Sequence, residues 1–172
     1  MRDGSLKNPS SFLEMKPTVP ILHIALVEPD IAPNVGAIAR LCAATNAKLH
    51  LIGKLGFRLQ DKAIRRAGLD YWPYVDLEIH PTWEVFRSSW PQLRCWGFSA
   101  RANASYLHAS FQVGDCLVFG SETSGLPKTL IEQELANTLL KIPMPGENVR
   151  CLNLSMSAGI ACYEALRQLN EL

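Results

Sequence analysis

The chain has 172 residues, of which 48% are hydrophobic and 19% charged, and its mean hydropathy is +0.04. This composition excludes a disordered or collagen-like chain, and the length predicts one domain. With 17 basic and 16 acidic residues the formal net charge is +1, so bulk charge does not attract nucleic acid. Any contact with nucleic acid must therefore come from a local basic patch. The longest apolar runs are far shorter than the roughly 18 residues that span a membrane.

The cysteines and the N-terminal segment indicate an intracellular protein. Five cysteines without paired spacing, and no secretion signal, argue against a disulfide framework and favour the reducing cytoplasm. The four histidines are scattered along the sequence, so we expect no structural metal site. Residues 1–20 are polar and contain three prolines, so we expect a flexible extension there and a single domain over residues 21–172.

The first half of the chain alternates strand and helix patterns. Short apolar runs predict strands at residues 22–27, 48–52 and 75–79. Between the first two strands, Asn34 is a plausible N-cap of a helix that ends at Asn46 in a left-handed conformation. Two further amphipathic segments predict helices, at residues 59–69 and 82–90.

The second half continues the alternation. Strands are predicted at residues 93–98, 115–119 and 138–142, and a helix from Pro127 through about Ala136. Ser155 could cap a final helix, whose apolar stripe consists of Ala158, Ala161, Cys162, Ala165, Leu166 and Leu169. The whole pattern predicts an α/β domain, with a mostly parallel sheet flanked by helices.

Three loops of unusual composition follow predicted strands, at residues 28–36, 120–127 and 143–155. Ligands gather beyond the carboxyl ends of strands in such sheets, which makes these loops the candidate site. The first loop lacks the G-x-G-x-x-G fingerprint of dinucleotide sites. The second has the glycine spacing of a P-loop, but Leu126-Pro127 stand where that motif requires lysine and serine or threonine. Neither familiar nucleotide motif is therefore present.

Several residues in these loops allow both a functional and a purely structural interpretation. The loop at residues 120–127 can approach a ligand through its glycines, and its only charge, Glu122, favours a neutral or positive ligand; it can also be a tight turn. Arg40 can bind phosphate or lie in solvent. Four more residues have the same ambiguity between function and capping or packing: Asn153, Ser155, Tyr163 and Cys151.

A basic cluster formed by Lys62, Arg65 and Arg66 lies near Tyr71 and Trp72 in the sequence. Basic and aromatic side chains together can bind phosphates and stack on bases. An ordinary solvated helix face is the alternative interpretation.

Three segments resemble the motifs of the SpoU-type RNA 2′-O-ribose methyltransferases of the SPOUT superfamily. They are motif one (residues 34–40, NVGAIAR), motif two (residues 119–127, FGSETSGLP) and motif three (residues 142–155, which begins IPMP and ends RCLNLS). The resemblance runs from about residue 22 to residue 169. Residues 61–72 and 162–169 are most similar to the short stand-alone enzymes that methylate the wobble nucleotide of certain leucine tRNAs.

The resemblance implies a C-terminal trefoil knot and a homodimer whose active site is shared between subunits. It also implies methyl transfer from S-adenosylmethionine to the ribose 2′-hydroxyl of a wobble cytidine or modified uridine in leucine tRNAs. From the sequence itself we expect no metal and no membrane partner, because no residue pattern indicates a metal and the apolar runs are short. Two alternatives stay open: a 2′-O-methyltransferase that acts on another tRNA or rRNA nucleotide, and a non-catalytic RNA-binding module of the same fold.

Site residues follow from the resemblance position by position. Cofactor contacts fall on Phe98, Gly120, Ile142 and Cys151, with Met144 and Leu152 as neighbours. Positions tied to catalysis or substrate placement are Arg40, Asn153, Ser155 and Tyr163. The candidates for phosphate contacts with RNA are Lys62, Arg65, Arg66 and Arg150. This chain departs from the common family pattern at Cys151, where serine is usual, and at Ser121, where proline is frequent. Because a guanidinium has a pKa above about 12, we expect Arg40 to hold a phosphate and stabilise alkoxide charge rather than to act as a base.

Overall fold

A computed structural model describes residues 20–58, 71–146 and 148–172. One seven-stranded sheet runs in the order β3-β2-β1-β6-β4-β7-β5, and every pairing between its strands is parallel. The strands are β1 (His23–Val27), β2 (Lys48–Ile52), β3 (Leu77–His80), β4 (Cys95–Phe98), β5 (Ala104–Ser105), β6 (Cys116–Phe119) and β7 (Leu139–Lys141). The predicted α/β class with a parallel sheet is confirmed.

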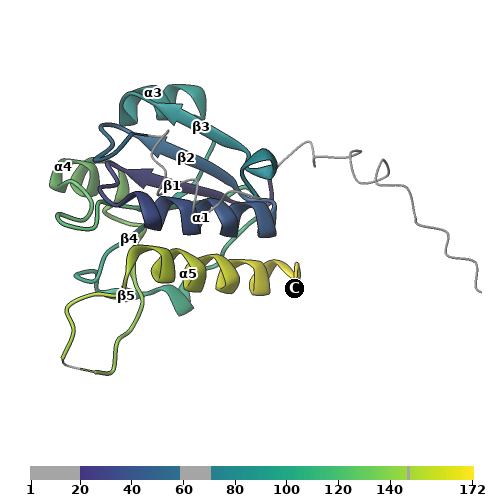
Figure 1. Cartoon of the computed structure of the whole chain (residues 1–172). Helices are drawn as coiled ribbons and strands as arrows, with labels where there is room; N and C mark the ends of the chain where they lie inside the picture. The colour runs from purple at the N-terminus through teal and green to yellow at the C-terminus, as the bar shows by residue number, and fades with distance from the viewer. Residues whose placement is uncertain (1–19, 59–70, 147) are drawn as a thin grey trace, which may run out of the picture.

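Helices cover both faces of this sheet (Figure 1). On one face lie α1 (Ala32–Thr45) and α5 (Leu154–Leu169), which pack against each other. On the other lie α3 (Trp83–Ser89) and the short α4 (Lys128–Leu130), which continues into a π-helical turn (Ile131–Leu135). Short 3₁₀ turns occur at η2 (Trp72–Tyr74) and η3 (Tyr106–His108).

The central strands are buried on both faces, which explains their continuous apolar runs. In β1, Ile24 and Leu26 pack in the core beneath α1 and α5, whereas Ala25 and Val27 pack beneath α3. Ile24 and Leu26 are completely buried, and truncating a side chain of this kind to alanine typically costs about 2–5 kcal/mol. The two cores hold the carboxyl edge of the sheet, and the loops that follow it, in a fixed frame.

The two long helices begin differently from the prediction. Ile31, not Asn34, is the N-cap of α1, and no side chain caps that end. The helix starts early because Pro33 suits its first turn, and the Asn34 amide bonds to other elements. Asn153, not Ser155, is the N-cap of α5. The predicted left-handed end of α1 at Asn46 is confirmed, with φ +54°.

Other differences concern short elements. The strand β5 has two residues, too few for any periodic pattern to predict it. The helix predicted from Pro127 is only one short α segment followed by a π turn. The helix predicted at residues 59–69 and the N-terminal extension lie outside the described residues. All five cysteines are free thiols. Within the described ranges, no helix has the length and apolar character needed to span a membrane.

Candidate functional site

Three of the residues predicted to bind the cofactor lie at one edge of the sheet. Phe98 ends β4, Gly120 directly follows β6, and Ile142 directly follows β7. Because β6, β4 and β7 are neighbours and parallel, their carboxyl ends bring these three residues to the same edge. This is where open α/β sheets bind ligands.

The loop after β6 is held tightly. The backbone of Ser121 and that of Gly125 exchange two hydrogen bonds, of 3.2 and 2.9 Å, which close the turn. A Cβ added to Gly120 would lie 2.0 Å from the carbonyl carbon of Gly125, so no side chain fits there. Gly125 itself has φ +73°, a conformation that favours glycine. Beside this loop the rings of Phe98 and Phe119 stack with centroids 4.9 Å apart.

The remaining predicted cofactor residues lie on the segment between β7 and α5, which extends from the sheet as a long loop (Figure 1). Met144 and Leu152 are half-buried and Cys151 is exposed. Together with Phe98 and Ile142 they supply side chains at and beyond the carboxyl ends of β4 and β7. An adenine ring needs an apolar slot with backbone hydrogen-bond partners, so this set of residues fits an adenosine-containing cofactor.

A chain of hydrogen bonds joins the three motifs. Both carboxylate oxygens of Glu122 in motif two accept bonds: Oε1 from Asn34 Nδ2, at 2.8 Å, and Oε2 from the backbone N–H of Asp30, at 2.7 Å. Asn34 Oδ1 in motif one accepts a bond of 3.0 Å from Asn153 Nδ2 in motif three. One buried amide therefore ties together segments up to 119 residues apart.

Asn153 also organises the start of α5. Its Oδ1 accepts hydrogen bonds from Ser155 N at 2.8 Å, Ser155 Oγ at 2.7 Å and Met156 N at 3.4 Å. Since the Ser155 hydroxyl donates to Asn153, the lone pairs of its oxygen are left to accept a bond from a ligand. Capping and site organisation are thus combined in one asparagine.

The hydrogen bonds that connect Asn34 with Glu122 and Asn153, called the joint below, were not predicted from the sequence. The sequence makes Asn34 a plausible helix cap, and the charge of Glu122 favours a neutral or positive ligand. In the structure both side chains instead form internal hydrogen bonds. The available signal was their position, because each comes soon after a buried strand: Asn34 in the first turn of α1 and Glu122 in the loop after β6. Polar side chains of neighbouring strands meet at this edge.

Arg40 and Tyr163 take no part in the hydrogen bonds that join Asn34, Glu122 and Asn153. Arg40 is exposed on α1, and its guanidinium carbon lies 4.4 Å from the centroid of the Tyr71 ring. Within the part of the chain that the structure describes, the guanidinium makes no hydrogen bond to Ser155 or Tyr163. The Tyr163 side chain on α5 is 48% exposed. Among the described residues, no hydrogen bond therefore links Arg40 to the other three predicted catalytic residues.

The predicted RNA-binding residues are only partly visible. Arg150 is exposed on the long loop before α5. The other three, Lys62, Arg65 and Arg66, lie outside the described residues.

One open cavity of about 640 Å³ lies on the other side of the sheet, between α3 and α4. Its lining includes Glu28, Lys54, Arg87 and Glu134, and it shares only Pro127 with the three motifs. The charges of these side chains are mixed, and the cavity does not contain any predicted cofactor residue. It is therefore separate from the candidate site.

A second polar cluster, also unexpected from sequence, lies beneath α3. His23, His50 and His80 are far apart in the sequence but adjacent across β1, β2 and β3. Burial, reinforced by the charge of Lys48, lowers the pKa of His23 to about 4. Burial, followed by the neighbouring histidines, lowers the pKa of His50 to about 2, and burial also lowers the pKa of His80. All three imidazoles are therefore neutral at pH 7.

Comparison with known proteins identifies the family. The model of the SpoU rRNA Methylase family matches residues 21–163. A Synechocystis protein named putative tRNA (cytidine(34)-2′-O)-methyltransferase is 48% identical over 154 residues, which cover 88% of this chain and 99% of that protein. A Methylovorus glucosotrophus tRNA (cytidine(34)-2′-O)-methyltransferase is 43% identical over 86% of this chain and 96% of its own length.

Solved structures agree with this match. A structure described as giving insights into 2′-OH methylation of C/U34 on tRNA has a TM-score of 0.82 at 46% identity, with 88% of this chain and 97% of that chain covered. The SpoU methyltransferase AviRb from Streptomyces viridochromogenes, solved with AdoMet, has a TM-score of 0.77 at 21% identity over 91% of this chain and 64% of its own, which shows the shared fold. Together with the family match, these findings confirm the resemblance: the chain belongs to the SpoU rRNA methylase family.

Proposed function

We propose that this protein transfers a methyl group from S-adenosylmethionine to the ribose 2′-hydroxyl of cytidine 34 in tRNA. Relatives that carry this activity in their names are 43–48% identical over 86–88% of the chain. We further infer that leucine tRNAs are the substrates and that a modified wobble uridine is also accepted. A cytoplasmic location follows from such a substrate.

The observation that carries this proposal is the hydrogen-bonded joint between Asn34, Glu122 and Asn153. It holds the start of α5 against the glycine loop after β6, at the edge where Phe98 and Ile142 end their strands. A merely structural loop would not need three polar side chains from three distant segments. A methyltransferase does need them, because transfer of a methyl group depends on alignment of two reactants.

The cofactor would supply an activated methyl group on a sulfonium sulfur. Phe98, Ile142 and Leu152 would bind its adenine by apolar contact, and Gly120 would let the backbone approach closely. Met144 and Cys151 would close the slot from the long loop. The proton of the 2′-hydroxyl must leave as the oxygen attacks the methyl carbon, so the site also needs a nearby acceptor and a stabilising positive charge.

Arg40 suits the second of these tasks. Its guanidinium lies over the face of Tyr71, an arrangement that leaves the N–H groups in the guanidinium plane directed outward. These N–H groups would bind a backbone phosphate of the tRNA and stabilise the developing alkoxide, and the phosphate would accept the proton. Ser155 and Asn153 would orient the ribose, and Tyr163 would contact the target nucleotide.

We also propose that the active site is shared within a homodimer. Among the described residues, no hydrogen bond joins Arg40 to motif three within one chain, and a second copy would bring its own Arg40 to the site. A C-terminal trefoil knot completes the proposal.

Mass spectrometry of leucine tRNA fragments, after incubation with protein and S-adenosylmethionine, tests the function. We expect one added methyl group on nucleotide 34, and none in a reaction without the cofactor. Calorimetry with S-adenosylhomocysteine should show one binding site per chain. Methylation of another nucleotide would reject the substrate assignment, and binding of S-adenosylhomocysteine without transfer to any tRNA would reject enzymatic function.

A further inference from the structure

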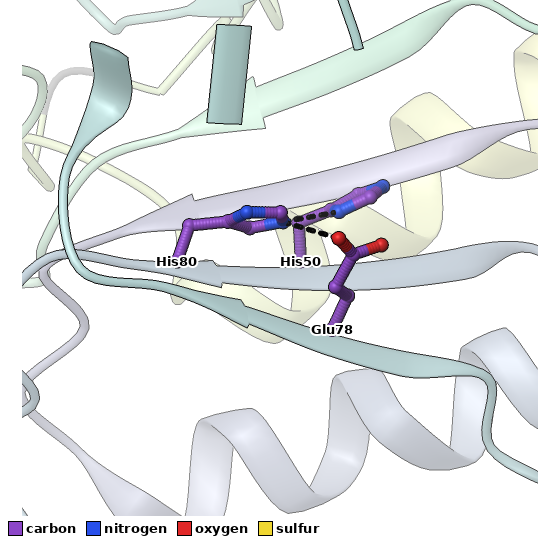
Figure 2. A group of neighbouring side chains, drawn as sticks. All are labelled: His50, Glu78 and His80. Carbon is purple, nitrogen blue, oxygen red and sulfur yellow. Dashed lines mark hydrogen bonds and ion pairs between the residues drawn. The ribbon is translucent and has the colours of Figure 1, made fainter. Parts of the chain in front are cut away.

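The cluster beneath α3 contains potential metal ligands on neighbouring strands (Figure 2). His50 lies on β2, and Glu78 and His80 lie on β3. The register pairs His50 with Glu78 and Ile52 with His80, so all three side chains point to the same face of the sheet. Figure 2 shows their polar ends converging on one point.

Their distances suit a tetrahedral metal ion. His50 Nδ1 lies 3.0 Å from His80 Nε2, and His80 Nε2 lies 3.7 Å from Glu78 Oε1. One ligand atom of each residue lies within 4.8 Å of the other two. With metal–ligand bonds of about 2.0–2.1 Å, tetrahedral geometry separates ligand atoms by roughly 3.3 Å. Shifts of a few tenths of an ångström would bring the two imidazoles to that spacing.

In His50 and Glu78, the polar atom that faces away from the centre of the cluster already has a hydrogen-bond partner. His50 Nε2 is 2.8 Å from His23 Nδ1, so the ring can donate to His23 while Nδ1 faces the centre. Glu78 Oε2 accepts a bond of 3.1 Å from Trp90 Nε1, which leaves Oε1 toward His80. Such outer hydrogen bonds, which fix the tautomer and direction of the ligands, accompany most protein metal sites.

The surrounding charges and burial are compatible with a bound cation. Lys48 Nζ lies 3.5 Å from Glu78 Oε2, but also 3.0 Å from Asp76, so its charge is balanced by a second carboxylate. His50 and His80 are at most 2% exposed, whereas the Glu78 side chain is 35% exposed. Glu78 therefore forms the rim through which an ion would enter and where water would take the fourth position.

We propose that His50, Glu78 and His80 bind a divalent transition metal, with Zn²⁺ as the ion that this donor set fits best. Two imidazole nitrogens and one carboxylate oxygen with an open fourth position are a common zinc arrangement. The site lies on the face opposite α1 and α5, so its role is to brace β2 against β3 and not to take part in methyl transfer. This inference is independent of the function proposed above.

Titration of the chelator-treated full chain with Co²⁺ tests the proposal, because tetrahedral Co²⁺ shows intense visible absorption bands. We expect one equivalent to produce these bands, Zn²⁺ to abolish them, and Zn²⁺ to raise the melting temperature. H80Q and E78Q should each lose the bands and the thermal shift. The matched control is H108Q, which changes an exposed histidine outside the cluster and should behave like the unchanged protein.

E78Q keeps the shape of a side chain that is one-third exposed, so it should fold even if H80Q does not; circular dichroism would verify this. H23Q should weaken Co²⁺ binding about 10–100-fold without abolishing it, as expected for a residue that positions a ligand. Unchanged Co²⁺ affinity in folded E78Q, or bands that vanish only in C151S, would overturn the proposal.

Discussion

Two polar clusters lie on opposite faces of the sheet, and they are assembled in different ways. On the side of α1 and α5, side chains 88 and 119 residues apart join the loop after β6 to the starts of two helices. Beneath α3, histidines 27 and 30 residues apart meet because their strands are neighbours in register. The first arrangement places polar groups at an edge open to a ligand, whereas the second places them inside the protein.

This difference affects what each cluster can do. Asn153 is exposed and Arg40 is exposed, so the first region can contact a large substrate without unfolding. His23 and His50 are at most 2% exposed and can contact only something as small as an ion or a proton. Changes in the first region should therefore act on methyl transfer, and changes in the second on stability.

Arg40 offers the sharpest test of the first region. We expect R40A to lower the rate of methyl transfer about 10²–10³-fold, the range found when one donor that stabilises a developing anion is removed. R40K should lose most of the rate too, because an ammonium cannot form the planar fork. Binding of S-adenosylhomocysteine, measured by calorimetry, should be unchanged in both variants. Near-normal turnover of R40K would contradict the assigned role.

Acidification should lower the unfolding free energy of the chain through the histidine cluster beneath α3. Burial depresses the pKa of His23 to about 4 in the folded chain, against an ordinary value of 6.5. The unfolded chain therefore binds more protons, and stability is complete above pH 6.5 and is lost as the pH falls toward 4. His23 alone would cost roughly 3 kcal/mol of unfolding free energy by pH 4. Urea unfolding of metal-free protein between pH 7 and 4 measures this loss.

The control for this prediction is the H23Q variant, and the quantity to compare is how the unfolding free energy of each protein changes with pH. H23Q should show a shallower loss of unfolding free energy on acidification than the unchanged chain, whatever its stability at pH 7. Methyl transfer at pH 7 should be the same in both proteins, since His23 lies on the far face. Equal slopes for the two proteins would show that His23 does not titrate as its burial implies.

Breaking the hydrogen bonds of Glu122, which connect motif two to motif one, should have an intermediate effect on the rate of methyl transfer. In E122Q, an amide group replaces one carboxylate oxygen, so either Asn34 or the Asp30 backbone faces a donor in place of an acceptor. We expect a loss of methyl-transfer rate of about 10²-fold, as for a misplacement of about 1 Å. E132Q, an exposed carboxylate on the π-helical turn, is the matched control and should retain the rate. Full activity of E122Q would show that the joint does not align the site.

The two regions also differ in how far sequence could predict them. The position of Gly120 directly after a strand is predicted correctly from sequence, because local patterns determine where strands such as β1 and β6 stop. The histidine cluster was missed, since it depends on the order and register of β1, β2 and β3. Neither quantity is encoded in a short stretch of sequence.

Within the site, what sequence could not supply was the partner of each polar side chain. Asn34 has the properties of an N-cap, and only the fold shows that its amide instead reaches Glu122 and Asn153. Likewise the apolar stripe of α5 predicted its buried face, but not that Asn153 caps it. Long-range side-chain bonds of this kind compete with local ones, and the tertiary structure decides between them.

The smallest expected effect concerns Arg150, which extends the first region toward the RNA. It is exposed on the long loop before α5, where it can contact a phosphate without changing the fold. R150A should weaken tRNA binding only a few-fold at low salt, and should reduce the slope of log affinity against log salt concentration by about one. K128A, which removes an exposed charge from α4 beneath the other face, should leave the slope unchanged. If K128A changed the slope and R150A did not, the tRNA would bind on the side of α3 and α4. The assignment of substrate binding to the side of α1 and α5 would then be wrong.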